Sequence, residues 1–446
     1  MARGFLPLPD ARAFRLENAR APACLVSAGG VAADADGFMR IDVMIENGRI
    51  ASLAPAGGFH LDGEDVPRVD CGGAIVLPRL VDIHTHLDKG HIWPRRRNPD
   101  GSFMGALAAA EADREANWSA QDVARRMDFA LRCALAHGTG AIRTHLDSIG
   151  KQTAISWPVF AEMRENWAGV IALQATALLP IDLVLDDEPQ FRAIVETVAR
   201  YEGVLGGVTY LGAAPDAKLD AALDRLFQAA AAEGLDVDLH VDESLAPDAR
   251  TLSRIAQAAI RNRFRGKILC GHCCALATMD EDDLARTIDL ACEARLAVVS
   301  LPMCNQYLQD RASGRTPRLR GVAPLHELKA AGIPVMVASD NTRDPFYAYG
   351  DLDLLEVFRE ATRICHLDHS DRNWLRTVAA TPADVMGLDR HGRLEAGDPA
   401  DLVIVRARAM TELLSRPQSD RTIVVAGRAI DNTPPDYSEL DDIVGL

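Results

Sequence analysis

The stretch Val81-Asp82-Ile83-His84-Thr85-His86-Leu87-Asp88-Lys89 follows an apolar run over residues 74–77 that is typical of a buried strand. Side chains two residues apart on a strand point the same way, so His84 and His86 present their imidazoles together at its carboxyl end. Two neutral imidazoles side by side suit a divalent metal such as zinc or ferrous iron. A single His-x-His pair is more often two ordinary loop or core histidines, so the rest of the chain must decide.

Strand-like and helix-like segments alternate along the chain after His86. Helix-like segments such as 119–137, 188–200 and 217–233 separate the candidate strands. An eightfold alternation predicts an α/β fold of the (β/α)8 TIM-barrel type. An open doubly wound sheet is the alternative, but the glycine-rich phosphate turn that usually follows its first strand is absent. After the first strand, the other seven candidates are residues 141–147, 170–178, 204–211, 235–243, 268–273, 297–303 and 334–341.

Both ends of the chain are expected to build a second, smaller β domain. Residues 41–46 alternate in polarity and are followed by Asn47-Gly48, the strongest short signal for a β-hairpin. Strand-like sequence returns after about Met386, with the apolar run at 402–405 as its clearest example. We predict an N-terminal arm over 1–21, a β-sandwich domain from 22–77 and 386–432, a barrel over 78–385 and an acidic tail over 433–446.

The composition argues against several classes of protein and of binding partner. The chain has 446 residues and a net charge of -16, which argues against nucleic-acid and anionic-membrane partners. It contains no apolar run of about twenty residues, and residues 1–21 do not have the composition of a secretory signal. Nine cysteines without framework spacing fit a reducing cytoplasm. The basic run Arg95-Arg96-Arg97 is a local exception, for which a solvated loop is favoured over a contact with an anionic substrate.

Ligand-type side chains recur at the carboxyl ends of four candidate strands, where barrel enzymes place their chemistry. Each of them alone is explained by an ordinary strand-end cap or turn. Together they predict one site, because parallel strands bring their carboxyl ends to the same edge. The set is His84 and His86, His240 with Glu243 three residues later, His272, and Asp340.

These residue types predict hydrolysis at an amide-like or amidine-like carbon. Three histidines and one carboxylate can hold a single divalent cation and leave a position for water, whose pKa the cation lowers towards neutrality. Glu243 can lie beside the cation without binding it and move a proton to a ring nitrogen or a leaving amine. Asp340 can accept a hydrogen bond from the nucleophile, and His272 can polarise the developing oxygen or orient the nucleophile.

The same residues carry a family resemblance. From about residue 22 to residue 427 the chain resembles the amidohydrolase superfamily and, within it, the cytosine deaminase branch. The matching stretches are 81–88, 142–147, 240–243, 271–272, 339–350 and 392–401. The resemblance implies one zinc or iron ion, because the segment 207–212 lacks the lysine that binuclear relatives carry there. It implies His84, His86, His240 and Asp340 as the metal ligands, Glu243 as the proton shuttle and His272 as the polarising residue.

The segment after the third strand departs from that branch. Ile181, after Pro180, stands where the branch carries a substrate-binding glutamine, and an isoleucine side chain can neither donate nor accept a hydrogen bond. This replacement argues against cytosine itself, since a site built on hydrogen bonds discriminates strongly through them. Gln174 lies earlier in the same strand and is a less favoured candidate for that contact.

Three further residues are candidate substrate contacts. Phe346 replaces the tryptophan of the branch and keeps an aromatic face for a planar ring. Asn341 directly follows Asp340. Lys89 stands in a stretch that resembles amidohydrolases acting on triazines, and it can contact a ring carbonyl or an anionic group. An ion pair of Lys89 with Asp88 or Asp147 is an equally favoured alternative.

We therefore predict a metal-dependent, cytoplasmic aminohydrolase that converts the C–NH2 group of a planar nitrogen heterocycle and water into a ring carbonyl and ammonia. Release of a substituted amine from a triazine, or opening of a cyclic amide, is the alternative chemistry. A third possibility is an inactive relative that serves as a metal-binding or assembly subunit. By analogy with relatives we expect a homo-oligomer.

Overall fold

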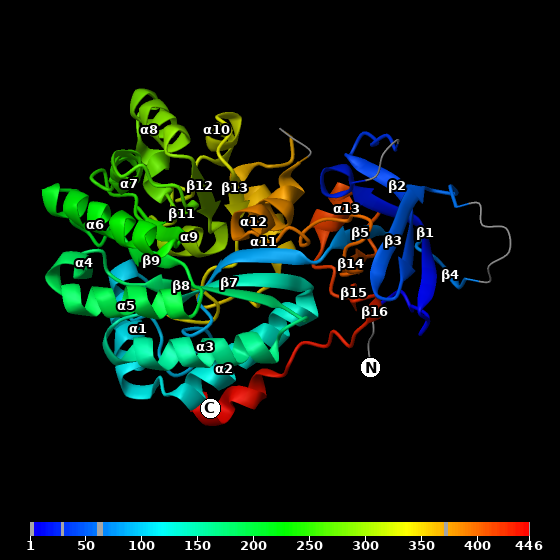
Figure 1. Ribbon diagram of the computed structural model, residues 1–446, viewed down its shortest axis with the longest axis horizontal. Coiled ribbons are helices and arrows are strands. Elements are labelled where there is room, and N and C mark those ends of the chain that lie inside the picture. Colours follow the sequence, from blue (N-terminus) through cyan, green and yellow to red (C-terminus); the bar gives the residue numbers. More distant parts are fainter. Residues whose placement is uncertain (1–3, 28–30, 60–65, 370–372, 446) are drawn as a thin grey trace.

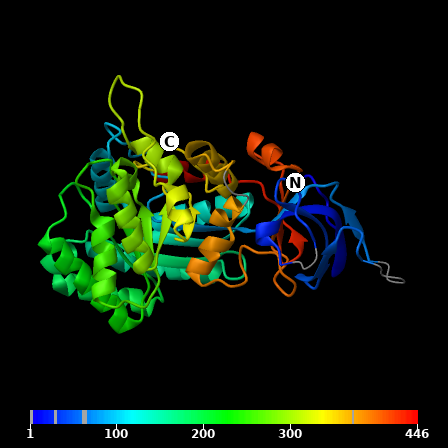
Figure 2. The same ribbon diagram turned by 90° about the horizontal axis from the view of Figure 1, so that it is seen from above.

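The computed structural model describes residues 4–27, 31–59, 66–369 and 373–445. Two lobes lie side by side along the long axis, a larger one of mixed helices and strands and a smaller one made mainly of strands (Figure 1). The view turned by 90° shows the same separation, with the strand that leads into the larger lobe running between them (Figure 2). The predicted mixed α/β fold is confirmed.

Strands from both ends of the chain form the sheet of the smaller lobe. This eight-stranded sheet has the order β16-β15-β14-β5-β1-β2-β3, and β4 also pairs with β1. Asn47 and Gly48 connect β2 to β3 with positive φ angles of 50° and 79°, as the tight hairpin turn requires. The strands are β1 Ala13–Pro22, β2 Phe38–Glu46, β3 Arg49–Pro55, β4 Arg68–Asp70, β5 Ile75–Pro78, β14 Leu402–Val405, β15 Thr422–Val425 and β16 Arg428–Ala429.

The expected N-terminal arm over residues 1–21 is wrong for its second half. Residues 13–22 form β1, which pairs with β2 on one side and with β4 and β5 on the other. Phe14 and Leu16 are buried in the core of the smaller lobe. The segment Phe14-Arg15-Leu16 alternates apolar and charged residues, so it carries a strand pattern of its own.

Eight parallel strands form the centre of the larger lobe. β6 to β8 make a three-stranded sheet and β9 to β13 make a five-stranded one. Isolated parallel bridges join the two sheets, Thr85 with Asp340 at one junction and Thr176 with Val204 at the other. The strands are β6 Leu80–Thr85, β7 Thr139–Asp147, β8 Ala172–Leu178, β9 Leu205–Val208, β10 Val237–Val241, β11 Ile268–His272, β12 Leu296–Ser300 and β13 Val335–Val337.

Helices lie outside these strands and pack their apolar faces against them (Figure 1). The longer ones are α1 Phe103–Asn117, α2 Ala120–His137, α3 Thr153–Asn166, α5 Glu188–Arg200, α6 Ala217–Glu233, α7 Thr251–Arg261, α8 Glu281–Glu293 and α11 Leu354–Cys365. The shorter ones are α4 Leu183–Asp186, α9 Pro302–Leu308, α10 Leu325–Ala330, α12 Ala380–Met386 and α14 Asp441–Val444. Helix α13 Met410–Ser415 lies beside the smaller lobe (Figure 1). No helix in the described ranges is long and apolar enough to span a membrane.

The end of α2 shows how the sequence joins the two lobes. Ser119 caps the start of α2 by accepting a hydrogen bond from the backbone N–H of Asp122. Gly138 ends the helix with a φ of 92°, and a Cβ there would lie 2.5 Å from a methyl group of Val403 in β14. Glycine is therefore required both for the left-handed cap and for the close approach of the smaller lobe.

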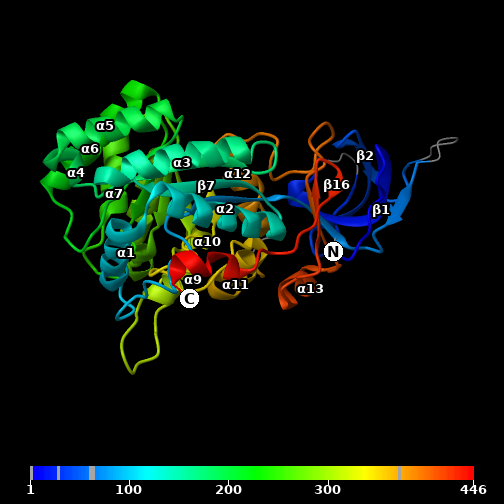
Figure 3. The ribbon, with the colours of Figure 1, turned by 90° about the horizontal axis from the view of Figure 1, so that it is seen from below.

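The acidic C-terminal segment lies against the larger lobe (Figure 3). The short 3-10 helix Tyr437–Leu440 leads into α14, and Leu440 packs with Phe129 of α2. Arg95 donates a hydrogen bond to the carbonyl of Ile443 at 2.9 Å. The acidic tail predicted over 433–446 is thus docked by apolar and polar contacts.

Candidate active site

The six ligand-type residues meet at the carboxyl ends of the parallel strands. His84 belongs to β6, His240 to β10 and His272 ends β11. Asp340 Oδ1 lies 3.3 Å from His86 Nε2 and 3.5 Å from His84 Nε2. His240 Nε2 and His86 Nε2 are 3.2 Å apart. Residues separated by up to about 250 positions in the chain therefore share one buried cluster.

Several polar atoms of this cluster have no hydrogen-bond partner within the described part of the chain. His84 Nε2 and both carboxylate oxygens of Asp340 are buried and unsatisfied. Such groups are rare in folded proteins because burying them without a partner costs free energy. A divalent cation bound by nitrogen and carboxylate ligands satisfies all of them at once, so the donor set fits a metal site.

The histidines are in the charge state that metal binding requires. Burial, followed by the positive charges of neighbouring groups, lowers the pKa of His84, His86 and His240 well below its ordinary value. Each imidazole is therefore neutral and keeps a lone pair for a cation.

Glu243 lies in the loop after β10 and faces the same cluster. Burial, and then the charge of Asp340, raises the pKa of Glu243 well above its ordinary value. Its Oε1 is 3.6 Å from His272 Nδ1. A buried carboxyl group with a raised pKa is a candidate for taking up and releasing a proton.

His272 is held by a residue that the sequence did not single out. Its Nδ1 accepts a hydrogen bond from the side-chain amide of Asn305 in α9, at 2.9 Å. Burial lowers the pKa of His272 to about 3, so the ring is neutral and its proton resides on Nε2. This arrangement makes Nε2 a hydrogen-bond donor.

A cavity of about 110 Å³ opens beside the cluster. Its polar lining includes His86, His240, Glu243 and His272, and its remaining walls are largely apolar. Helix α1 and the ends of β8 and β9 contribute to these walls. The residues of these walls include Phe103, Leu107, Leu178, Leu179, Pro180 and Val208.

Three of the predicted substrate contacts line this cavity, namely Lys89, Asn341 and Phe346. Lys89 Nζ lies 3.2 Å from Asp147 Oδ1 and 5.2 Å from the centroid of the Phe346 ring. Burial lowers the pKa of Lys89, but the carboxylates of Asp147 and Asp88 raise it by more, so the ammonium group stays charged. The ion pair with Asp147 and the position in the cavity wall are thus both present.

The other two predicted substrate contacts do not line the cavity, and these expectations are corrected. Ile181 packs in the hydrophobic core, and its backbone N–H donates to the carbonyl of Val208. Gln174 bonds to Arg143 and to the carbonyl of Met386. Ile181 comes three residues after β8 ends, so strand alternation no longer determines which way its side chain points.

The basic run after the first strand does not reach the cavity either. Arg95 bonds to the carboxylates of Asp113 and Asp122, and Arg96 and Arg97 are exposed. The favoured interpretation of a solvated run holds for the latter two, whereas Arg95 is a structural residue.

His145 is the main site residue that sequence reasoning missed. It is fully buried in β7, and its Nε2 lies 3.1 Å from His84 Nδ1. The same strand-end criterion that selected the other histidines would have selected it, because it stands near the end of a predicted strand.

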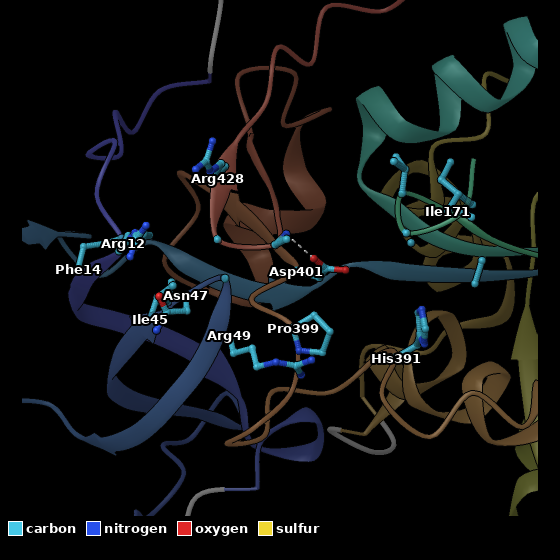
Figure 4. A pocket seen from close by; sticks show the side chains of 18 of the residues that line it. Arg12, Phe14, Ile45, Asn47, Arg49, Ile171, His391, Pro399, Asp401 and Arg428 are labelled. Atoms are coloured by element: carbon cyan, nitrogen blue, oxygen red, sulfur yellow. Dashed lines mark hydrogen bonds between the residues drawn. The ribbon is translucent and has the colours of Figure 1, made fainter. Parts of the chain in front are cut away.

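A larger cleft of about 780 Å³ lies between the two lobes. Figure 4 shows its lining, with Arg12, Arg49 and Arg428 on the side of the smaller lobe and His391 and Ile171 on the other. It shares no lining residue with the cavity beside the histidines. The clustered metal-ligand chemistry thus selects the smaller cavity as the candidate active site.

Comparison with known proteins agrees with this assignment. A model described as the Amidohydrolase family matches residues 199–430. A pterin deaminase from Rhizobium rhizogenes is 54% identical over 446 residues, covering 100% of both chains.

Solved structures are similar over nearly the whole chain. The 5-methylcytosine deaminase of Klebsiella pneumoniae, liganded with 5-fluorocytosine, superposes with a TM-score of 0.76 at 23% identity, covering 94% of this chain and 97% of that one. The N-isopropylammelide isopropylaminohydrolase of Burkholderia multivorans does so with a TM-score of 0.71 at 26% identity, covering 94% and 98%. With the family match and the full-length relative, the chain belongs to the amidohydrolase family.

Proposed function

We propose that this chain is a pterin deaminase, which hydrolyses the exocyclic C–NH2 group of a pterin to a ring carbonyl and ammonia. The chain is a hydrolase of carbon–nitrogen bonds that deaminates a planar nitrogen heterocycle. The full-length identity of 54% to a pterin deaminase supports the narrower substrate. The observation that carries the proposal is the cluster of unsatisfied buried atoms on His84 and Asp340, directly beside Glu243 and an apolar cavity.

The metal site is part of the proposal. His84, His86, His240 and Asp340 would hold one divalent cation, zinc or ferrous iron. A cation bound there supplies Lewis-acid activation of water, which makes water a competent nucleophile at neutral pH.

Proton transfer falls to Glu243 in this scheme. It would accept one proton from the attacking water and deliver it to the ring nitrogen next to the reacting carbon. The second proton, released by the added hydroxyl as the ring carbonyl forms, would pass to the amine, which leaves as ammonia. The raised pKa of Glu243, which burial and the charge of Asp340 cause, supports this role as a group that takes up and delivers a proton. Asp340 orients the water by accepting a hydrogen bond, and His272 donates from Nε2 to the oxygen that develops on the carbon.

The ring itself is held by the cavity wall. Phe346 covers one face of the planar heterocycle. Lys89 donates to the ring carbonyl oxygen, and Asn341 also lines the cavity. The apolar side chains contributed by α1 and by the ends of β8 and β9 exclude water from the bicyclic ring.

The proposal also covers the fold of the two lobes, the cellular compartment and the oligomeric state. The parallel bridges at both sheet junctions support a closed (β/α)8 barrel over residues 78–385. The sheet from both chain ends would fold as a β-sandwich domain over 22–77 and 386–432, extended at its start by β1. Nine free cysteines support a reducing cytoplasm, and the net charge of -16 supports a small-molecule substrate rather than nucleic acid. Homo-oligomerisation remains part of the proposal by analogy.

The test is ammonia release by protein loaded separately with zinc and with ferrous iron. Pterin, cytosine, guanine and N-isopropylammelide form the substrate panel, and we expect pterin to have the highest kcat/KM. Deamination of cytosine without deamination of pterin would overturn the bicyclic assignment, and bound metal without ammonia from any substrate would overturn the reaction.

Glu243→Gln tests the proton shuttle in the same assay. The variant should keep one equivalent of metal and lose about 10²- to 10⁴-fold in turnover, the usual contribution of a positioned acid–base group. Glu165→Gln, on an exposed glutamate of α3, is the matched control and should retain full turnover.

A further inference from the structure

We propose that His145 is a positioning residue that orients the ring of His84, so that Nε2 of His84 faces the cation. The inference rests on the proposed metal site but not on the identity of the substrate. It concerns a histidine that lies outside the proposed ligand set.

His145 lies next to the nitrogen of His84 that faces away from Asp340. The two residues lie on the neighbouring parallel strands β6 and β7, and both are fully buried. His145 Nε2 lies 3.1 Å from His84 Nδ1, with the ring centroids 4.1 Å apart. The opposite nitrogen of His84, Nε2, is turned towards Asp340.

The protonation of a neutral imidazole explains the pairing. Such a ring has one protonated and one unprotonated nitrogen, so a His84 ring that binds a cation through Nε2 carries its proton on Nδ1. That buried N–H needs an acceptor, and His145 Nε2 is the partner that the structure provides. Accepting this hydrogen bond fixes both the tautomer and the rotation of the His84 ring.

A second layer of polar contacts holds the region around His145. Asp238 Oδ1 lies 3.8 Å from His145 Nε2, beyond hydrogen-bond distance. The other carboxylate oxygen of Asp238 accepts from Arg143 Nη1 at 3.1 Å, and Arg143 in turn donates to Gln174. Arg143 thus engages Oδ2 of Asp238, and Oδ1, which has no hydrogen-bond partner in the described structure, lies too far from His145 Nε2 to accept from it. His145 Nε2 is therefore left to accept from His84.

A role of His145 as a ligand of a second cation is the competing explanation. His84, His145 and His240 do bring three nitrogens together. However, once His84 uses the lone pair of Nε2, its Nδ1 carries a hydrogen and cannot bind a second cation. This reasoning favours positioning over ligation, and the number of cations bound per chain separates the two.

The experiment measures zinc affinity and stoichiometry by competition with a chromogenic chelator, without any substrate. His145→Phe keeps a planar ring but removes the acceptor, and we expect zinc affinity to fall about 10- to 100-fold, as for other residues that orient a metal-bound histidine. His145→Gln places an amide oxygen near the former Nε2 position and should recover most of that loss. His91→Phe is the control, at another buried histidine, whose ring packs against Phe129, and it should bind zinc as the protein without substitutions does.

Two results would overturn the inference in protein that folds. Unchanged zinc affinity in His145→Phe would show that His84 needs no acceptor. Two zinc ions per chain, falling to one in His145→Phe, would make His145 a ligand. If the phenylalanine variant fails to fold, His145→Gln is compared with His145→Asn, whose shorter amide cannot reach His84. Higher affinity in the glutamine variant supports the inference, and equal affinities overturn it.

Failure of the proposed function is distinguishable from failure of this inference. Protein that binds one zinc but does not deaminate pterin loses only its substrate assignment, and the His145 effect is still expected. If the protein without substitutions binds no zinc, both the proposed metal site and the inference about His145 are wrong.

Discussion

Two buried polar clusters flank the segment from His86 to Arg95, and they differ in how their atoms are satisfied. In one, His84 Nε2 and both oxygens of Asp340 lack any hydrogen-bond partner in the described structure. In the other, Arg95 donates a hydrogen bond to Asp113 at 3.0 Å and Arg126 donates one to Asp122 at 2.7 Å. The contrast distinguishes a cluster completed by the protein from one that requires a ligand.

The satisfied cluster also supports the unsatisfied one. Arg126 donates to the backbone carbonyls of Asp88 and Gly90 at 2.7 and 3.0 Å. These carbonyls flank Lys89, which lines the cavity. We infer that the paired charges hold the loop that carries Lys89, the proposed substrate contact. The unsatisfied atoms of His84 and Asp340 would bind the proposed cation.

The largest expected effect comes from removing a proposed metal ligand. His240→Ala should lose bound zinc and reduce kcat/KM by about 10³-fold or more, because Lewis-acid activation contributes several kcal/mol. Metal content by atomic emission and ammonia release are the measurements. A normal metal content would break the ligand assignment and, with it, the proposed difference between the clusters.

The second-largest expected effect is on stability, and metal binding should not change. Asp122→Asn leaves Arg95 and Arg126 with an incomplete set of buried partners, so we expect the free energy of unfolding to fall by about 3–5 kcal/mol. Zinc stoichiometry of the folded protein should not change. Asp128→Asn is the matched control, because its pair with Arg132 is well exposed and should cost less than about 1 kcal/mol. Equal costs for the two variants would show that burial does not distinguish them.

The buried ion pair of Asp353 with Arg421 shows how the stability that such a satisfied pair contributes depends on pH. Burial raises the pKa of Asp353, but the charge and hydrogen bonds of Arg421 lower it by more, and the net result is a pKa below the ordinary value. A depressed pKa contributes stability that is complete above the unfolded pKa of about 3.9 and is lost as pH falls through the folded value. Asp353→Asn should therefore cost about 2 kcal/mol at pH 7 and progressively less below pH 4.

Denaturant unfolding of both proteins between pH 7 and pH 3 measures this difference. Carboxylates that do not interact with Asp353 cancel in the difference, whereas Glu356, whose pKa the charge of Asp353 helps to raise, also contributes to it. A cost that stays constant or grows towards acid pH would contradict the lowered pKa.

The smallest effect is expected at Ile181. The side chain packs in the core and does not line the cavity, so Ile181→Val should cost about 0.5–1.5 kcal/mol of stability. The KM for pterin should stay unchanged. An altered KM without a change in stability would return Ile181 to the substrate site and contradict its observed position.

The sequence alone determined the strand–helix alternation and the candidate ligand set. A strand repeats every two residues, and parallel strands end at one edge, so His84, His86, His240, His272 and Asp340 could be grouped without coordinates. The Asn47-Gly48 turn was readable for a similar reason, because it depends only on local backbone conformation.

Contacts between distant segments were decided only by the tertiary structure. Asn305 of helix α9 reaches His272 at the end of β11, and the C-terminal segment packs on α2 through Leu440. Ile181 turns into the core after its strand has ended, where no periodic pattern determines direction. Local periodicity thus predicts which residues reach a strand end, whereas packing between segments decides which of them touch, and hence that His145 stands behind His84.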